Sequence, residues 1–301
     1  MDLKQLEYFV HVAELRSFTR AAAYLQVAQP ALSRQVRTLE VELRQPLLDR
    51  NGRGVTPTEA GQRLLAHARG ILQQVERARD ELEDLRGAAS GRLVMALPPS
   101  LSRTLTGPLV RAFRQRLPRA TLSVVEGLSA YALEWLVMGR VDCAVVYNAT
   151  PSPSLDLLPL VDEPLFLVTP RVPGTPAIGP AIALRDVAEH ALVIPSRPHS
   201  MRMLLEAALA AEGRRVRVAL EVESVPAMLD LVLQGDGQAV LAQNALQGSG
   251  RPEAFQLRPI GPPRLAASLW LATSAQRPRG PLIEQGTEVL KALLQPAGPV
   301  L

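Results

Sequence analysis

The apolar residues between Ser17 and Leu43 constrain the fold of this chain more than any other stretch. After Gln29 they recur three or four positions apart, which predicts a helix with one buried face. These residues are Leu32, Val36, Leu39 and Leu43. Ser17 is a good N-cap for an Ala-rich helix that continues to about Leu25. An earlier helix is predicted from the apolar stripe of Leu6, Phe9, Val10 and Ala13. The chain should therefore begin with three short helices.

The third of these helices carries a polar stripe beside its buried face. Gln29, Ser33 and Arg37 are four residues apart, and Arg34 lies next to them. Gln and Arg match the donors and acceptors of base edges, and Ser and Arg suit phosphate oxygens. Pro30 fits the first turn, where its missing N–H costs no helical hydrogen bond. The stripe predicts a helix that binds duplex DNA, and its candidate contacts are Gln29, Pro30, Ser33, Arg34 and Arg37.

A short hairpin is predicted after the third helix. Asn51-Gly52 is a strong turn signal between the segments 46–50 and 54–57. Arg50 and Arg53 would lie near the tip of this β-wing, where arginine suits a minor groove or its bordering phosphates. Four arginines and no acidic residue occur from Arg16 to Arg37, which favours phosphate contact. The alternative is a helical core with ordinary solvated arginines.

Several motifs follow one another at fixed spacing in this region. They are Leu6-Glu7-Tyr8-Phe9, Ser17-Phe18-Thr19-Arg20-Ala21-Ala22, Gln29-Pro30-Ala31-Leu32-Ser33, Leu39-Glu40, Pro46-Leu47-Leu48 and Thr56-Pro57-Thr58-Glu59-Ala60-Gly61. In order and spacing they closely resemble the bacterial LysR-type transcriptional regulators. One departure is Ala28, where the family often has Ser as a helix cap; a weaker cap costs about 1 kcal/mol locally. The resemblance implies a winged helix-turn-helix DNA-binding domain at residues 1–58.

A long helix is predicted from an N-cap at Thr58 to about Arg86. Its apolar residues alternate at spacings of four and three, as in a coiled coil. This apolar seam comprises Leu64, Ala68, Ile71, Val75, Ala78, Leu82 and Leu85. We expect pairing with a second copy, against the alternative that the helix packs on its own domain. The resemblance implies antiparallel pairing, and often a tetramer of two dimers. Residues 59–90 would form this linker, with a hinge at 87–91.

Composition places the chain among ordinary globular proteins. It has 301 residues, 47% of them hydrophobic, and a formal net charge of +4, which suits a nucleic-acid binder without proving one. Cys143 is the sole cysteine, which excludes an internal disulfide. Asp2, Glu7 and Glu14 interrupt any signal-peptide core, and no apolar run approaches the ~20 residues that span a bilayer. A cytoplasmic protein without a membrane partner is expected.

Residues 91–301 alternate between short β runs and helices. The predicted strands are 93–97, 121–125, 143–147, 164–169, 191–195, 218–222, 238–241 and 265–273; the predicted helices are 106–116, 130–138, 201–211, 226–234 and 281–294. This alternation predicts a doubly wound α/β domain with a largely parallel sheet. It resembles the two-lobed periplasmic substrate-binding proteins, the fold of LysR-type effector domains. By that analogy the first lobe takes residues 92–161 and 267–301, and the second 162–266.

Ligands of open α/β sheets bind beyond the carboxyl ends of the strands. The candidate effector-binding residues at such positions are Ser100, Leu101, Ser102, Ser129, Tyr147, Ser196, Arg197 and Arg202. Hydroxyls and helix N-terminal amides favour anions, and Arg197 or Arg202 would clamp a carboxylate or sulfonate. The alternative is that these are capping serines and surface arginines. A small, anionic effector between the lobes is the expectation.

Catalytic residues and cofactor motifs are not indicated. The four histidines lack metal-binding spacing, and Cys143 lies in an apolar strand. Gly235-x-Gly237 lacks the third glycine of a dinucleotide loop, since Val240 occupies that position. The sequence thus predicts a non-enzymatic, homo-oligomeric regulator that binds operator DNA, contacts RNA polymerase and responds to a small-molecule co-inducer. The alternatives are an effector-independent regulator and a cytoplasmic solute sensor without DNA binding.

Overall fold

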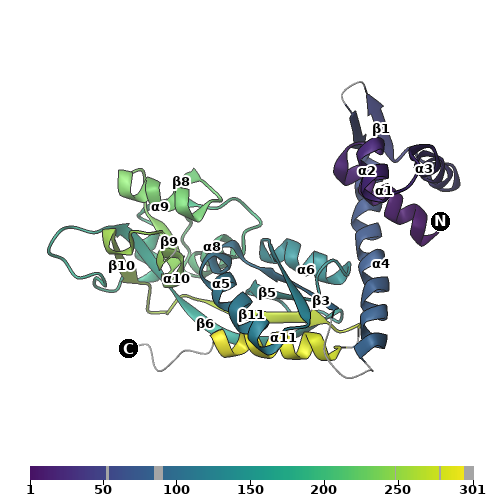
Figure 1. Ribbon diagram of the computed structural model, residues 1–301. Helices are drawn as coiled ribbons and strands as arrows, with labels where there is room; N and C mark the ends of the chain where they lie inside the picture. The colour runs from purple at the N-terminus through teal and green to yellow at the C-terminus, as the bar shows by residue number, and fades with distance from the viewer. Residues whose placement is uncertain (52–53, 85–90, 248, 278, 295–301) are drawn as a thin grey trace. The chain divides into compact units, whose positions relative to one another are not determined.

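The computed structural model describes residues 1–51, 54–84, 91–247, 249–277 and 279–294. The chain forms two compact units that divide near residue 88. Among the described residues, no helix combines the length and the apolar character that crossing a bilayer would require. Each unit is described separately below, and both are drawn in Figure 1.

The N-terminal unit has three short helices, a hairpin and a long helix (Figure 1). Its elements are α1 Leu3–Leu15, α2 Phe18–Tyr24, α3 Gln29–Leu43, β1 Leu48–Asn51, β2 Gly54–Pro57 and α4 Glu59–Asp84. Ser17 caps α2, because its hydroxyl accepts a hydrogen bond from the amide of Arg20. Ala28 precedes α3 with extended backbone but gives no side-chain cap. The predicted helices and both cap assignments are confirmed.

One apolar cluster holds the first three helices and the hairpin together. Leu32, Val36 and Leu39 of α3 are fully buried in it, against Phe9 of α1 and Leu47. The prediction is wrong for Leu43, which is 36% exposed. Leu43 is the last residue of α3, and the left-handed Arg44 turns the chain away there. The buried stripe is thus shorter than the spacing suggested.

The predicted hairpin is confirmed as an antiparallel pair of β1 and β2. Its register pairs Asn51 with Gly54, so Asn51 belongs to the strand and not to the turn. Gly52 and Arg53 lie outside the described residues. One carboxylate oxygen of Glu40 accepts the amides of Leu47 and Leu48 at 2.9 and 3.2 Å. This contact fixes the start of the hairpin to the C-terminal part of α3.

The long helix α4 begins where predicted, because the Thr58 hydroxyl accepts the amide of Gly61 at 3.0 Å. Its apolar seam divides into two parts. Leu64 and Ala68 pack into the core of the N-terminal unit, as the alternative reading expected. Farther along, Ile71 and Leu82 are 38% and 67% exposed in the single chain. Leu85 and most of the predicted hinge lie outside the described residues.

The C-terminal unit is an α/β structure built on one mixed sheet and one short parallel pair. Its elements are β3 Gly91–Leu97, α5 Pro99–Arg116, β4 Ala120–Glu126, α6 Ser129–Val137, β5 Cys143–Tyr147, β6 Leu155–Pro170, α7 Leu184–Val187, β7 Ala191–Ile194, α8 Ser200–Ala211, β8 Arg217–Glu221, α9 Val225–Gln234, β9 Ala239–Ala242, α10 Gln243–Gln247, β10 Phe255–Pro259, β11 Ala266–Ser274 and α11 Pro281–Leu294. A short 3-10 turn covers Pro252–Ala254. The α/β class is confirmed.

The prediction of a largely parallel sheet is wrong. The strand order is β10-β6-β11-β5-β3-β4, with β9 also paired to β6. Only β3 pairs in parallel, with β4 and β5, whereas β11 and β6 form antiparallel ladders. The second parallel pair is β7 with β8. The sheet is mixed because β11 runs antiparallel to both of its neighbours, β5 and β6, whereas β3 runs parallel to β4 and β5.

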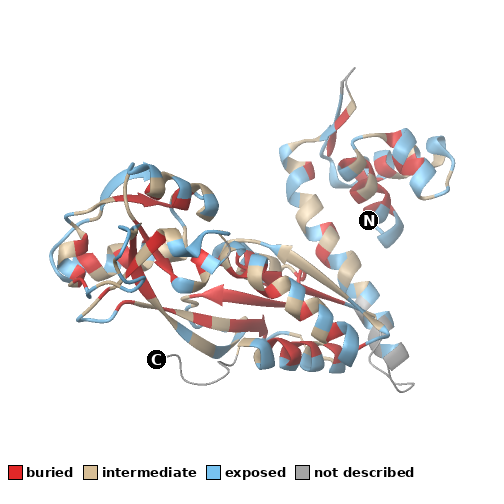
Figure 2. Cartoon of the chain, turned by 60° about the vertical axis from the view of Figure 1, so that its left-hand side comes forward, coloured by how far each residue is buried: buried red, intermediate tan, exposed pale blue. Residues whose placement is uncertain are grey.

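Both faces of the sheet around β3 are covered by helices. Leu93, Met95 and Leu97 belong to an apolar cluster that also contains residues of α5 and α11. Val94 and Ala96 point to the other face, where they pack with α6. Figure 2 shows the central strands as largely buried. The continuous apolar run 93–97 is explained by this burial on both sides.

Strand β6 is longer than predicted and belongs to two ladders. Its first part, up to Pro164, pairs with β11, and its second part, from Leu165, pairs with β9 and β10. We call the parts of the unit on either side of this change the first and second lobes. The exact lobe and domain limits given above stay predictions. Helix α5 also starts earlier than predicted, because Pro99 occupies its first turn and Pro108 is accommodated inside it.

The caps of α2 and α3 predict that one substitution lowers the free energy of unfolding and another raises it. Ser17→Ala should lower the free energy of unfolding by about 1 kcal/mol, because the amide of Arg20 loses its acceptor. Ala28→Ser should raise it by about 0.5–1 kcal/mol, because Ala28 already has the extended backbone of an N-cap. Chemical denaturation of the full chain measures both changes. Equal stability of the two variants would contradict this account of the caps.

Candidate functional site

The polar face of α3 is open to solvent. Gln29, Pro30, Arg34 and Arg37 are exposed, and Ser33 is half-buried. Their opposite face is held in the core by Leu32, Val36 and Leu39, so the helix cannot turn them inward. Because the helix is amphipathic, burial of one face determines which side chains the other presents. The structure thus brings together the five candidate DNA contacts predicted on α3 without assigning their role.

The wing contributes Arg50, which is exposed next to α2. Its guanidinium carbon lies 4.4 Å from the centre of the Phe18 ring, within the range of a cation–π contact. Phe18 is itself buried in the core of the unit. Stacking on its ring gives Arg50 a defined position while the side chain stays accessible to solvent. Arg53, the other predicted wing contact, lies outside the described residues.

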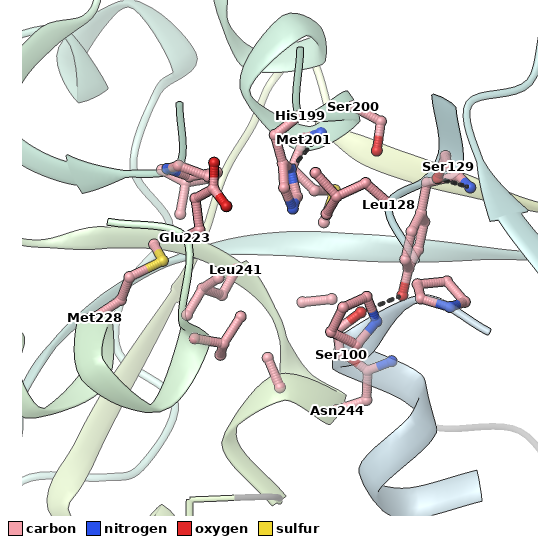
Figure 3. A pocket seen from close by; sticks show the side chains of 18 residues that line it. Ser100, Leu128, Ser129, His199, Ser200, Met201, Glu223, Met228, Leu241 and Asn244 are labelled. Carbon is pink, nitrogen blue, oxygen red and sulfur yellow. Dashed lines mark hydrogen bonds between the residues drawn. The ribbon is translucent and has the colours of Figure 1, made fainter. Parts of the chain in front are cut away.

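A second candidate site is a pocket between the two lobes of the C-terminal unit, shown in Figure 3. Its cavity measures about 50 Å³ and adjoins an open cleft of about 360 Å³. Ser100, Ser129 and Tyr147 line it from the first lobe, and His199, Glu223 and Asn244 from the second. The first turns of α5, α6, α8 and α9 all contribute lining residues. Most of the remaining lining is apolar, including Leu128, Met201, Met228 and Leu241.

The polar end of the pocket is organised around the carboxylate of Glu163, and we call this group of residues the floor network. The Tyr147 hydroxyl donates to Glu163 Oε2 at 2.9 Å, and Asn244 Nδ2 donates to Glu163 Oε1 at 2.7 Å. Ser100 Oγ donates to Tyr147 Oη at 3.5 Å. Burial raises the pKa of Glu163, although the bonds from Tyr147 and Asn244 oppose this. Burial also raises the pKa of Tyr147, which therefore keeps its proton.

His199 and Glu223 form another part of the wall. The His199 imidazole is the N-cap of α8, where Nδ1 accepts the amide of Met201 at 3.3 Å. Burial lowers the pKa of His199, and the charge of Glu223 raises it by a smaller amount. The ring is therefore neutral near neutral pH, with its proton on Nε2. In Figure 3 the ring of His199 extends toward the middle of the pocket.

The structure separates the predicted effector-binding residues into two groups. Ser100, Ser129 and Tyr147 line the pocket, and Ser129 Oγ also accepts the amide of Tyr147 at 2.9 Å. The second group does not line the pocket; it comprises Leu101, Ser102, Ser196, Arg197 and Arg202. Leu101 and Ser102 are instead buried within the first turns of α5.

The expected arginine clamp for an anion is not present in this pocket. Arg202 is buried and donates to Glu206 at 2.9 Å, to Glu221 at 2.6 Å and to the carbonyl of Pro195. Arg197 pairs with Glu206 at 2.7 Å. Two carboxylates therefore already neutralise the guanidinium groups that were predicted to bind the effector. The structure places both arginines in an ion-pair network outside the described pocket lining.

Glu163, Glu223 and Asn244 were not among the predicted site residues. Asn244 follows β9 directly and Glu223 follows β8, so the rule that ligands bind at strand ends could have found both. Glu163 lies inside β6, and the sequence offers no signal for its role. His199 was not among the predicted site residues either, and the structure places it in the wall of the pocket.

Two family models together match most of the chain. The bacterial regulatory helix-turn-helix protein, lysR family, matches residues 3–62, and the LysR substrate binding domain matches residues 86–295. The nitrogen assimilation regulatory protein nac of Klebsiella aerogenes is 33% identical over 296 residues, covering 98% of this chain and 95% of that protein. The HTH-type transcriptional regulator BbuR of Bordetella bronchiseptica is 31% identical over 246 residues, covering 82% and 75%.

Solved structures show the same fold over the full length. Full-length CbnR in complex with its target DNA has a TM-score of 0.71 at 25% identity, covering 97% of this chain and 99% of that chain. CbnR, a LysR family transcriptional regulator, solved in another crystal structure, has a TM-score of 0.72 at 24% identity, covering 98% and 100%.

The comparisons agree with the helix-turn-helix unit and the two-lobed α/β unit described above. Together they define one class of protein, a DNA-binding regulator with an effector-binding domain. The chain belongs to the LysR family of transcriptional regulators. The resemblance seen in the sequence is thereby confirmed.

The ion-pair network around Arg202 generates a stability prediction. Arg202→Ala should lower the free energy of unfolding by about 2 kcal/mol, because Glu206 and Glu221 lose a buried partner. Arg185→Ala is the control: its pair with Asp186 is exposed and spans 3.4 Å, so its loss should change stability by less than about 0.5 kcal/mol. Chemical denaturation measures both. Equal stability would return Arg202 to the candidate effector contacts.

Proposed function

We propose that α3 docks in the major groove of an operator and reads base edges with Gln29, Ser33, Arg34 and Arg37. The observation that carries this proposal is their joint exposure on a helix whose other face is locked in the core. Pro30 starts the helix at the DNA surface, and Arg50 and Arg53 contact phosphates or the minor groove. The complex of full-length CbnR with its target DNA supports this use of the fold.

We further propose that the chain acts as a homo-oligomer, either a dimer or a tetramer of two dimers, through the exposed part of the α4 seam. Ile71 and Leu82 leave a long apolar strip uncovered in the single chain, as expected for a helix with a coiled-coil partner. Two such units would read half-sites about 34–36 Å apart, or a multiple of that distance.

The interlobe pocket is the proposed site of a small-molecule effector that alters the orientation of the two lobes. Its mostly apolar lining with a few converging polar groups is typical of ligand sites. Such a change would reach the DNA-binding units, and through them RNA polymerase. A coupling of about 1–3 kcal/mol is sufficient for regulation. The chain then acts in the cytoplasm by binding alone, without catalysis; its matched relatives are transcriptional regulators.

Arg34→Ala tests the DNA interface. Binding to the promoter beside its own gene should weaken by about 1–3 kcal/mol, because a side chain that reads a base is lost. Gel-shift titration at fixed salt measures the change, and size-exclusion chromatography checks that the oligomer is intact. Arg217→Ala, an exposed arginine of β8, is the matched control and should bind like the wild type. Unchanged affinity of Arg34→Ala would remove Arg34 from the interface, and a wild-type protein that shifts no promoter fragment would refute the proposed function.

Leu82→Asp tests the proposed oligomer. A charge on the apolar strip should split the oligomer and weaken binding to a two-half-site operator more than to a single half-site. Gln74→Asp places the same charge on an exposed polar position of α4 and should leave the oligomer intact. Light scattering gives the mass of each variant. An unchanged mass for Leu82→Asp would show that the strip is not the contact.

A further inference from the structure

The donors and acceptors of the floor network have fixed roles, because an ionised carboxylate can only accept hydrogen bonds. Both oxygens of Glu163 receive a donor, one from Tyr147 at 2.9 Å and one from Asn244 at 2.7 Å. Double acceptance of this kind is the pattern of an ionised carboxylate. Glu163 itself is not part of the pocket lining, whereas Tyr147 and Asn244 are. Its influence on a ligand therefore passes through these two side chains.

Tyr147 has one hydroxyl proton, which it donates in the hydrogen bond to Glu163. The lone pairs of Tyr147 Oη are then the groups left for other contacts, and Ser100 already donates to one of them at 3.5 Å. The residue is buried, with 4% of its surface exposed, so water has little access to that oxygen. Because its one proton is committed to Glu163, Tyr147 offers a bound molecule no hydrogen-bond donor.

Asn244 is oriented in the same way. Its Nδ2 donates to Glu163, which fixes the amide so that Oδ1 is the free end. Among the described residues, Asn244 Oδ1 is a buried oxygen without a hydrogen-bond partner. An unpaired buried acceptor destabilises the site, so a ligand that brings a hydrogen-bond donor gains affinity there. A side chain that lines the pocket and carries such an oxygen is a ready contact for a bound molecule.

The rest of the lining does not offset these acceptors with a cationic side chain. The described lining of the pocket contains one charged group, Glu223, and no lysine or arginine. In Figure 3, Glu223 and Asn244 lie on different sides of the cavity. The neutral His199 ring and the serine hydroxyls offer hydrogen-bond donors elsewhere in the lining. At the floor itself, a ligand carboxylate would meet the unpaired oxygen of Asn244, with the negative charge of Glu223 across the cavity.

We infer that the pocket selects an effector that places an N–H donor, as in a primary amide or an ammonium group, on Asn244 Oδ1, with Glu163 as the positioning residue. This inference rests on the proposed function, since it specifies the effector of the same pocket. It replaces the anionic effector expected from the sequence. The apolar side chains of Met201, Met228 and Leu241 would hold the carbon skeleton of the molecule.

Glu163→Gln should reverse this selectivity. The glutamine amide can donate to Asn244 Oδ1, so the Asn244 side chain is free to turn and present its NH₂ group to the pocket. A floor that offered acceptors would then offer a donor, which suits a carboxylate. The substitution keeps the shape of the side chain, and the fold is checked by operator binding and oligomer mass.

The probes are butanamide, pentanamide and hexanamide, each paired with the carboxylate of the same length. Titration of the full-length protein, followed by ligand-observed NMR, gives the affinity ratio within each pair. The wild type should bind the amides about 10- to 100-fold more tightly, because the carboxylates leave buried acceptors unpaired. Glu163→Gln should abolish or invert this ratio. Asn244→Ala should reduce it at least threefold.

Glu223→Gln is the matched control, because it also removes one carboxylate charge, here from the pocket wall, without altering the floor network. It should improve carboxylate binding only slightly and keep the preference for amides. If Glu163→Gln and Glu223→Gln changed the affinity ratio of amide to carboxylate equally, net charge alone would explain the selectivity. That result would overturn the inference. Wild-type protein that binds neither probe class, or prefers carboxylates, also overturns it. If promoter binding persists in those cases, the proposed regulator function stands while its effector chemistry fails.

Discussion

The C-terminal unit depends on one strand, β6, that is hydrogen bonded to the ladders of both lobes. Its partners change between Pro164 and Leu165, where β11 gives way to β9 and β10. A continuous strand connects the lobes more stiffly than a loop, so any change in their orientation must be absorbed within a few residues. Glu163 lies beside this changeover and binds Tyr147 of β5 and Asn244 of α10. The network that orients the pocket floor is therefore also a link between the lobes.

Much of the N-terminal unit could be predicted from the sequence because its signals are local. Helical spacing, the Ser17 cap and the Asn-Gly signal act within a few residues; the helices follow them closely, and the hairpin forms with Asn51 in its first strand. The failures also have local causes that spacing does not reveal: Arg44 ends α3 and leaves Leu43 exposed. The apolar seam of α4 has two different environments along the helix. Leu64 and Ala68 pack into the core of the N-terminal unit, whereas Leu82 is exposed in the single chain.

The C-terminal unit could be predicted in its elements but not in their pairing. Strand β5 and helix α11 have the predicted bounds, whereas the antiparallel ladders of β6 and β11 depend on residues more than 90 positions apart along the chain. The pocket shows the same division. Ser100, Ser129 and Tyr147 follow from the rule for strand ends. The bond between Glu163 and Asn244 spans 81 residues and has no local signal, whereas the i,i+4 spacing of Arg202 and Glu206 is a local signal of their ion pair.

The position of the pocket explains how a small molecule could act on distant DNA contacts. A ligand shifts an equilibrium only through contacts that differ between the two states. Ser100 and Tyr147 belong to one lobe and His199, Glu223 and Asn244 to the other, so a bound molecule touches both. Asn244 Oδ1 has no hydrogen-bond partner among the described residues, so a donor placed there would add a contact to the second lobe. Under the proposed function, such a bridging molecule would favour the lobe orientation in which both sets of contacts form together.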